Sequence, residues 1–172
     1  MAGEHELSKV EPLGKQHNLD EFDCEKHESL NTWLKKYARA NQASDTSKTY
    51  VVHRNNVVVA YYAIAAGSVR KHDASARVAK GGQPDPIPIS LLARLAVDKH
   101  EQGRGLGKAL LKDALLRIEQ AADIIGIRAI LVHAIDADAA NFYKNFDFEE
   151  SPVNELHLML LMKDLRATLN RV

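Results

Sequence analysis

The stretch that decides the fold is Leu91-Leu92-Ala93-Arg94-Leu95-Ala96-Val97-Asp98, followed by Gln102-Gly103-Arg104-Gly105-Leu106-Gly107 and Lys108-Ala109-Leu110-Leu111. It predicts an apolar strand, a short polar turn, a glycine-rich loop and the start of a helix. Glycine has no Cβ, so the backbone of such a loop can approach a ligand closely. A helix N-terminus has unpaired N–H groups and a partial positive charge, so this order of elements predicts a seat for phosphate or pyrophosphate.

Two common phosphate-binding motifs do not fit this loop. A P-loop would need glycine at position 102 and Ser or Thr at position 109, where the chain has Gln102 and Ala109. A dinucleotide-binding fingerprint has the spacing G-x-G-x-x-G, whereas the glycines here alternate at 103, 105 and 107. A glycine-rich turn without a ligand is the plain alternative, but the strand before the loop and the helix after it favour a binding loop.

Composition predicts one globular domain over residues 1–172, with a polar segment at 1–20 that is flexible or forms an edge. The longest apolar run, residues 57–66, is too short to span a bilayer, and the N-terminus lacks the basic and apolar regions of a signal peptide. We therefore expect no membrane partner and a cytoplasmic location. The single cysteine, Cys24, excludes an internal disulfide and fits a reducing compartment. We expect no metal site.

Charge is unevenly distributed although the formal net charge is zero. Residues 33–82 contain nine Lys and Arg but only two Asp, an excess of seven positive charges that the rest of the chain balances. Such asymmetry indicates an anionic partner, although a solvated face of mixed charge would also explain it.

Hydrophobic periodicity places the secondary structure. Strands are expected at residues 49–53, 57–66, 87–97, 129–135, from 148, and at 156–162. Helices are expected between residues 26 and 41, within 74–80, at about 105–125, and from a cap at Asp136 or Asp138 to 145. The strand–helix–strand order over 87–135 predicts a parallel βαβ unit with hairpins on both sides. The fold class is therefore α+β (α/β), with a central mixed, mostly antiparallel sheet and flanking helices.

The pattern Q-x-x-G-x-G after a strand ending in Leu95-Ala96-Val97 resembles the pyrophosphate loop of the GCN5-related N-acetyltransferases (GNAT). The resemblance implies the GNAT fold and acetyl-CoA as co-substrate. It implies that the backbone of Leu95, Ala96 and Val97 bonds to the pantetheine. It assigns the pyrophosphate to Gln102, Gly103, Arg104, Gly105, Leu106, Gly107 and Lys108.

A second signature, N-F-Y-K-N-F-D-F at residues 141–148, resembles the segment N/A-x-x-F-Y-x-x-x-G-F of the same family. The resemblance implies that Tyr143 lies beside the acyl sulfur as the catalytic residue and that Asn141 contacts the cofactor. A phenol with an ordinary pKa of about 10 stays protonated at neutral pH and can donate to a departing thiolate. Taken alone, Tyr143 would be interpreted as a packing residue. Asp147 replaces the family's usual glycine, a departure that could alter the exit of the helix.

No strong general base stands out. His133 lies in an apolar strand and is expected to be a hydrogen-bonded core residue, whereas Asp98 and Glu101 near the loop are possible bases. An α-amino group has an ordinary pKa of about 8 and a lysine of about 10.4, so the lack of a base favours an α-amine substrate.

Six segments occur in the order found in the GNAT-type toxins of bacterial type II toxin–antitoxin modules, and the similarity covers residues 20–162. The segments are Trp33-Leu34, residues 49–52, 66–69, 84–88 (P-D-P-I-P), 92–98 (L-A-R-L-A-V-D) and 126–134. The resemblance implies acetylation of the α-amine of aminoacyl-tRNA, inhibition of translation, a ribbon-helix-helix antitoxin and a homodimer.

The basic region then has a partner, because tRNA phosphates are bound by Lys and Arg. Arg77 and Lys80 lie where the family carries tRNA-contacting residues. The expected tRNA-binding residues are Arg77, Lys80, Arg70, Lys71, Lys36 and Arg39.

Two other functions stay open. One is a GNAT enzyme acting on a small amine or a protein N-terminus, which an acidic substrate pocket would favour. The other is a catalytically silent acyl-CoA-binding regulatory partner, against which Tyr143 and the intact loop argue.

Overall fold

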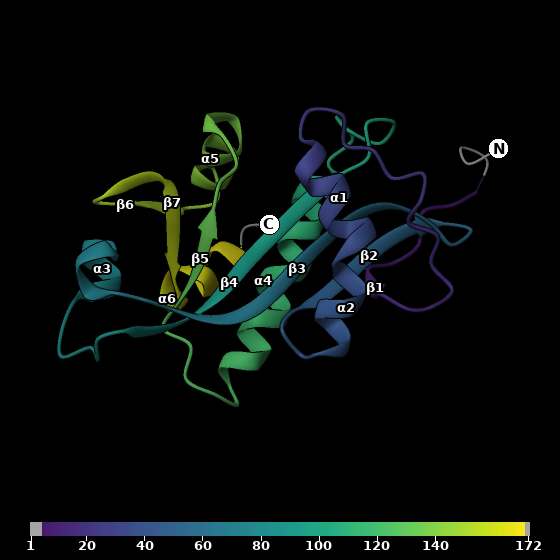
Figure 1. Cartoon of the computed structure of the whole chain (residues 1–172). Helices are drawn as coiled ribbons and strands as arrows, with labels where there is room; N and C mark the ends of the chain where they lie inside the picture. The colour runs from purple at the N-terminus through teal and green to yellow at the C-terminus, as the bar shows by residue number, and fades with distance from the viewer. Residues whose placement is uncertain (1–4, 171–172) are drawn as a thin grey trace. The chain divides into compact units, whose positions relative to one another are not determined.

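The computed structural model describes residues 5–170, which fall into two compact units (Figure 1). Unit 1 contains the chain as far as Ala65 together with Arg94–Ala114, and unit 2 contains Ala66–Ala93 and the chain from Leu115 onward. The single domain expected over residues 1–172 stays a prediction, as does flexibility at 1–20, and residues 1–4 and 171–172 lie outside the described part. Within the described part, no helix is long and apolar enough to cross a membrane.

Across residues 5–170, seven strands follow the order β1-β2-β3-β4-β5-β7-β6. Their bounds are β1 Glu11–Pro12, β2 Lys48–Arg54, β3 Val57–Val69, β4 Ile87–Val97, β5 Ala129–His133, β6 Glu149–Ser151 and β7 Asn154–Leu161. Strand β4 is parallel to β5, whereas β1–β2, β2–β3, β5–β7 and β6–β7 are antiparallel. This mixed sheet confirms the expected fold class, and β4 has the predicted bounds.

The β2–β3 hairpin turns through two asparagines, as predicted. Asn55 has φ 47° and Asn56 has φ 69°, so both adopt the left-handed conformation that a tight hairpin turn needs. Asparagine tolerates this conformation better than most residues.

The single helix expected between residues 26 and 41 is wrong. The structure has α1 Glu28–Lys36 and α2 Ala38–Ala43, which are separated at Tyr37 with φ −119°. Tyr37, expected in the buried stripe, is 52% exposed. The break lets α2 pack beside β2. There the Gln42 side-chain amide donates to the Leu13 carbonyl (2.7 Å) and accepts from the Thr49 N–H (3.0 Å).

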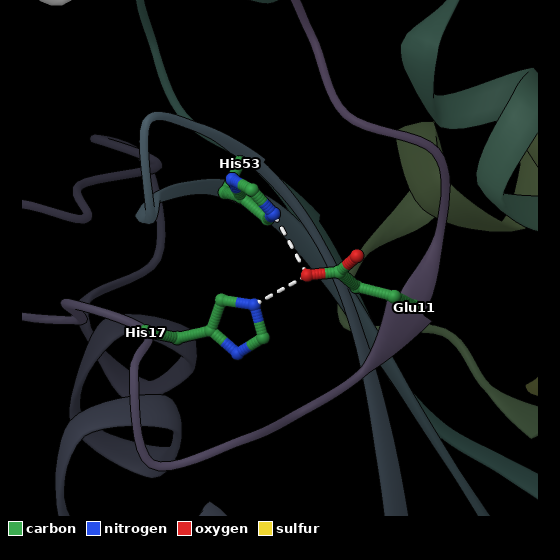
Figure 2. A group of neighbouring side chains, drawn as sticks. All are labelled: Glu11, His17 and His53. Atoms are coloured by element: carbon green, nitrogen blue, oxygen red, sulfur yellow. Dashed lines mark hydrogen bonds and ion pairs between the residues drawn. The ribbon is translucent and has the colours of Figure 1, made fainter.

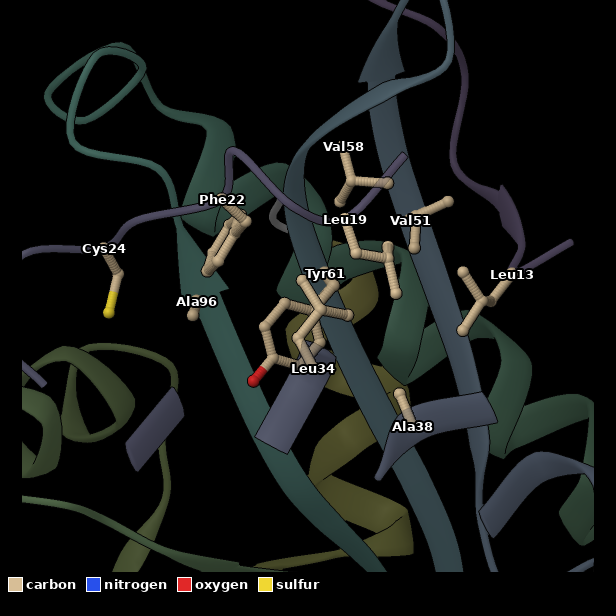
Figure 3. Packing of buried hydrophobic residues seen from close by; sticks show 10 residues of the cluster. All are labelled: Leu13, Leu19, Phe22, Cys24, Leu34, Ala38, Val51, Val58, Tyr61 and Ala96. Atoms are coloured by element: carbon tan, nitrogen blue, oxygen red, sulfur yellow. The ribbon is translucent and has the colours of Figure 1, made fainter. Parts of the chain in front are cut away.

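The core of unit 1 is built around Tyr61 (Figure 3). Its ring stacks on Trp33 with centroids 6.0 Å apart and meets the edge of Phe22 at 5.4 Å. Its hydroxyl donates to the Leu30 carbonyl at 2.7 Å, which satisfies the one polar atom of this buried side chain. The helix α1 is thus fastened to β3 by both stacking and a hydrogen bond.

In unit 2 a 3-10 turn, η2 Lys71–Asp73, leads into the predicted short helix, α3 Ala76–Ala79. The Ser75 hydroxyl caps α3 by accepting the Val78 N–H. Val78 is buried in a cluster with residues from β3, β4, β5 and β7, which holds this polar connection against the sheet.

The long helix α4 Leu106–Ala122 runs through both units and ends earlier than predicted. The stripe from Leu110 to Ile118 is buried as expected, but Ile125 is 58% exposed. The Ala121 carbonyl accepts the N–H groups of both Ile124 and Ile125, which closes the last turn.

The C-terminal third contains one helix that the sequence did not predict. Strand β5 ends at His133, two residues early, and Asp136 caps α5 Ala137–Lys144 by accepting the Ala139 N–H at 2.8 Å. The expected last strand stops at Leu161, and α6 Met162–Leu169 begins there. The alternation of apolar residues extends to Met162, so the sequence pattern did not show that the strand ends at Leu161 and a helix begins.

We expect Phe22→Ala to lower the free energy of unfolding by about 3–5 kcal/mol, because it leaves a cavity against Tyr61. Tyr61→Phe, which removes only the hydroxyl, is the control and should cost about 1–2 kcal/mol. Urea unfolding measures both, and equal losses for the two variants would contradict this account of the core.

Candidate functional site

The glycine-rich loop has the backbone conformation expected of a ligand-binding loop. Gly103 has φ 79° and Gly105 has φ 81°, both in the left-handed region, and an added Cβ at either position would meet no atom within 4 Å. Glycine is therefore needed for the backbone angles and not for lack of space. The helix α4 begins at Leu106, directly after the second of these glycines. The loop is solvent-exposed and leads into a helix N-terminus, as an anion site requires.

Gln102 ties this loop to the end of β4. Its side-chain amide donates to the Val97 carbonyl at 2.9 Å and to the Cys24 carbonyl at 3.1 Å. The parallel pairs between β4 and β5 run from Ile89–Ala129 to Leu92–Val132, and β4 continues as far as Val97. Unit 1 therefore brings the loop together with the predicted pantetheine-binding residues at the end of β4.

The two carboxylates proposed as bases are engaged in structural bonds. Glu101 is buried, receives two hydrogen bonds from Arg54 (2.8 and 3.2 Å) and lies 3.5 Å from the Arg104 guanidinium. Its hydrogen bonding to Glu101 raises the pKa of Arg54. Asp98 is also buried and accepts from the Asp23 N–H and from both the backbone and the ring of His100. These bonds favour a role in holding the loop rather than in proton transfer.

Tyr143 lies in unit 2 on α5, which follows the end of β5 (Figure 1). Its side chain is buried between Phe142 (centroids 5.1 Å apart) and Phe148 (5.4 Å). Burial raises the pKa of the Tyr143 phenol, so the hydroxyl stays protonated throughout the neutral range and can donate a proton. Asn141, on the same helix, is exposed.

Asp147 reproduces the turn for which the resembled family uses glycine. Its φ is 72°, in the left-handed region, and its carboxylate accepts a 3.0 Å hydrogen bond from the Thr168 hydroxyl on α6. The Phe146 N–H donates to the Tyr143 carbonyl at 2.9 Å. The exit of α5 thus has the backbone that a glycine would give.

The predicted tRNA-binding residues lie in both units. Arg77 and Lys80 line one pocket of unit 2, of about 540 Å³, and Arg70 lines another. Lys36 and Arg39 are exposed residues of unit 1, while Lys71 is half-buried in unit 2.

Two of these arginines already have protein partners. Arg77 forms a bidentate ion pair with Asp164 (3.0 and 2.6 Å), and Arg39 donates to the carbonyls of Gly14 and His17. Both guanidinium groups therefore already have acceptors within the fold.

The pocket with Arg77 and Lys80 contains three further basic residues, which the sequence did not predict as binding residues, namely Arg128, Lys163 and Arg166. Arg128 donates to the carbonyls of Val78, Arg77 and Lys80, which anchors α3. Lys163 and Arg166 are three residues apart on α6, a helix that the sequence did not predict after the strand expected at 156–162.

The expectation that His133 is a core residue is wrong. It is exposed at the end of β5 and stacks on His157 of β7, with ring centroids 4.0 Å apart and planes at 18°. Both rings line a pocket of about 430 Å³ in unit 2.

Comparison with known proteins is consistent with this geometry. The sequence profile of the acetyltransferase (GNAT) domain family matches residues 45–150. A Mycobacterium tuberculosis protein named tRNA-acetylating toxin is 56% identical over 139 residues, which cover 81% of this chain and 83% of that protein.

Two solved structures are similar over nearly the whole chain. AtaT complexed with acetyl-methionyl-tRNAfMet has a TM-score of 0.85 and 26% identity, and the match covers 94% of this chain and 98% of AtaT. A mutant AtaT toxin bound to the C-terminus of the antitoxin AtaR has a TM-score of 0.80 and 25% identity, with 97% and 99% covered.

Unit 1 also contains a cluster of side chains of the types that bind metal ions, which the sequence did not predict. Glu11, His17 and His53 place their ligand atoms within 4.8 Å of one another (Figure 2). Each His Nδ1 accepts a backbone N–H, from Gly14 (2.8 Å) or Asn56 (3.0 Å), so each Nε2 carries the proton.

Both Nε2–H groups donate to the same oxygen of Glu11 at 2.7 Å. A metal ion would have to displace these two protons, whereas metal-bound histidines usually donate from their other nitrogen. The geometry therefore favours a hydrogen-bonded clasp that joins β1, the following loop and β2.

The clasp makes stability depend on pH. Hydrogen bonds from His17, and then from His53, lower the pKa of Glu11 from its ordinary value of 4.5. A carboxyl with a lowered folded-state pKa stabilises the fold above its unfolded pKa, and this contribution is lost as pH falls. We expect Glu11→Gln, which keeps an acceptor oxygen, to weaken the dependence of unfolding free energy on pH below 4.5. Urea unfolding from acid to neutral pH measures this, and an unchanged profile would contradict the role of Glu11.

Proposed function

Because this chain belongs to the GNAT acetyltransferase family, we propose that it transfers the acetyl group of acetyl-CoA to the α-amino group of aminoacyl-tRNA and so inhibits translation. The observation that carries the proposal is the close similarity to a tRNA-acetylating toxin in a chain that keeps both the loop and the buried tyrosine. A small-amine acetyltransferase would share the loop and the tyrosine but would not need the basic region.

We assign the co-substrate to two sets of residues. The loop from Gln102 to Lys108 would bind the pyrophosphate, since Gly103 and Gly105 adopt left-handed angles just before the N-terminus of α4. The backbone of Leu95, Ala96 and Val97 would bond to the pantetheine, and Asn141 would contact the cofactor.

The chemistry needs a proton donor at the sulfur. The amine attacks the thioester carbonyl, a C–N bond forms, and the C–S bond breaks with its electron pair moving to sulfur. Tyr143 would give its hydroxyl proton to that thiolate, and its burial keeps the phenol protonated until the thiolate forms. The flanking rings of Phe142 and Phe148 hold the phenol in place.

The proposed partners, tRNA and an antitoxin, are inferred from the basic residues of this chain and from its similarity to AtaT. The tRNA would contact Arg77, Lys80, Arg70, Lys71, Lys36 and Arg39. We add Arg128, Lys163 and Arg166 to this proposal, because they line the same pocket as Arg77 and Lys80. AtaT, a relative in fold and sequence, binds an antitoxin, and we propose a cognate antitoxin of the ribbon-helix-helix type here. We also propose a homodimer that works in the cytoplasm, where charged tRNA is found.

Gly105→Asp should abolish acetyl-CoA binding, because it adds bulk and negative charge at the pyrophosphate seat. Gly105→Ala is the matched control, since its Cβ meets open space and only the backbone angle is strained. Calorimetric titration with acetyl-CoA compares them, and wild-type affinity in Gly105→Asp would show that the loop does not bind the cofactor.

Tyr143→Phe should keep the fold and the affinity for acetyl-CoA but lower turnover by about 10²–10⁴-fold, the usual range for a lost general acid. It should also relieve any growth arrest caused by expression. Rapid-quench assays with charged tRNA measure turnover, and a wild-type rate would identify Tyr143 as a packing residue.

Arg77→Ala with Lys80→Ala should weaken tRNA binding and make the slope of log affinity against log salt shallower by about one to two units. Acetyl-CoA binding should not change. The control is Lys9→Ala with Lys15→Ala, which removes two exposed lysines outside the basic region. Filter binding at several salt concentrations tests this, and equal slopes for the two double variants would remove Arg77 and Lys80 from the tRNA site.

A further inference from the structure

We propose that His133, oriented by its stack on His157, accepts the proton that the substrate amine loses as it attacks the thioester. The inference rests on the proposed function, because it assigns a second catalytic residue to the same reaction. Sequence alone placed His133 in the core, and the structure instead exposes it in a pocket beside a second imidazole.

Its position along the chain places His133 at the carboxyl end of β5, shortly before the helix that carries Tyr143. It is the last residue of β5. The parallel pairing of β5 with β4 ends one residue earlier, at Val132. Residues 134–136 then lead into α5, which carries Tyr143 (Figure 1). The proposed acid and the proposed base thus flank the same carboxyl end of one strand.

The pocket around His133 has suitable size and chemistry. Its volume is about 430 Å³, and its polar lining comes from Ser68, Arg70, Asp73, His133 and His157. An aminoacyl group fits a site of this size, since small-molecule sites span roughly 300–1,000 Å³. Asp73 can attract an ammonium group and Arg70 can bind a phosphate of the tRNA end.

The stack fixes the orientation of the His133 ring. The two imidazoles lie 4.0 Å apart and nearly parallel, and the His157 Nε2 lies 3.4 Å from the side-chain nitrogen of Asn154. The His157 ring thus limits the rotation of the His133 ring by stacking on it. His157 is therefore a positioning residue.

The charged and titratable groups that line this pocket with His133 come from three elements. Arg70 precedes the η2 turn, Asp73 lies on it and is paired with His72 at 3.0 Å, and His157 lies on β7. Asp98 and Glu101, which the sequence offered as possible bases, accept hydrogen bonds within unit 1 and are not assigned this role.

The proton balance is complete with this assignment. As the amine nitrogen bonds to the acetyl carbon, its proton moves to His133. The C–S bond breaks, and sulfur takes the proton of Tyr143. His133 then releases its proton to solvent, and Tyr143 regains one from solvent, so amide and free thiol are the only products.

The test is the kcat of the full-length protein with charged tRNA and acetyl-CoA, measured against pH at saturating substrate. We expect His133→Gln to lower kcat by about 10²–10⁴-fold, with KM and acetyl-CoA affinity unchanged. In the acid range the slope of log kcat against pH should also fall by about one unit, because one fewer group must be deprotonated. His133→Asn provides a second variant of the same exposed position.

His157→Phe keeps an aromatic ring for stacking and should retain most of the rate, whereas His157→Ala should lose more. Tyr143→Phe should lower kcat but keep the wild-type slope in acid, which separates the two roles. Wild-type kcat and slope in both His133 variants would overturn the inference while leaving the proposed function intact. A native protein that fails to acetylate charged tRNA would overturn the proposed function and this inference with it.

Discussion

The parallel pairing of β4 with β5 is the constraint on which the rest of the structure depends. It joins two strands whose carboxyl ends lead into different segments. The chain continues from β4 to the glycine-rich loop and from β5 to α5. Parallel strands need a long crossover, and α4 supplies it while its N-terminus follows the loop. Chain connectivity alone therefore places the proposed cofactor loop after one strand and the proposed acid and base at the end of the other.

In each unit, polar side chains hold the backbone by hydrogen bonds. Gln102 fastens the loop to the end of β4, and the buried Glu101 is locked by Arg54. Asp147 takes a left-handed conformation where the resembled family has glycine, and Thr168 holds its carboxylate. Within each unit, such bonds fix the local backbone of a segment that we propose binds a ligand.

Local sequence signals predicted the elements that depend on short-range physics. The bounds of β4, the turn at Asn55-Asn56 and the cap at Asp136 were confirmed, because periodicity, left-handed tolerance and capping act within a few residues. The break at Tyr37 was missed, since it depends on hydrogen bonds of Gln42 to distant backbone.

Contacts between side chains on different strands were also not predicted, because they join residues that are distant in sequence. The stack of His133 on His157 joins two strands, and the basic pocket around Arg128 joins segments far apart in sequence. The roles of the loop residues and of Tyr143 came from the family resemblance, and they stay predictions for this chain.

The central claim is that the chain acetylates the α-amine of charged tRNA. Its most direct test is mass analysis of the amino acids released from tRNA in a cell-free translation reaction, with and without acetyl-CoA. We expect N-acetylated amino acids and arrested translation only when acetyl-CoA is present. Unmodified amino acids, or arrest that does not need acetyl-CoA, would contradict it.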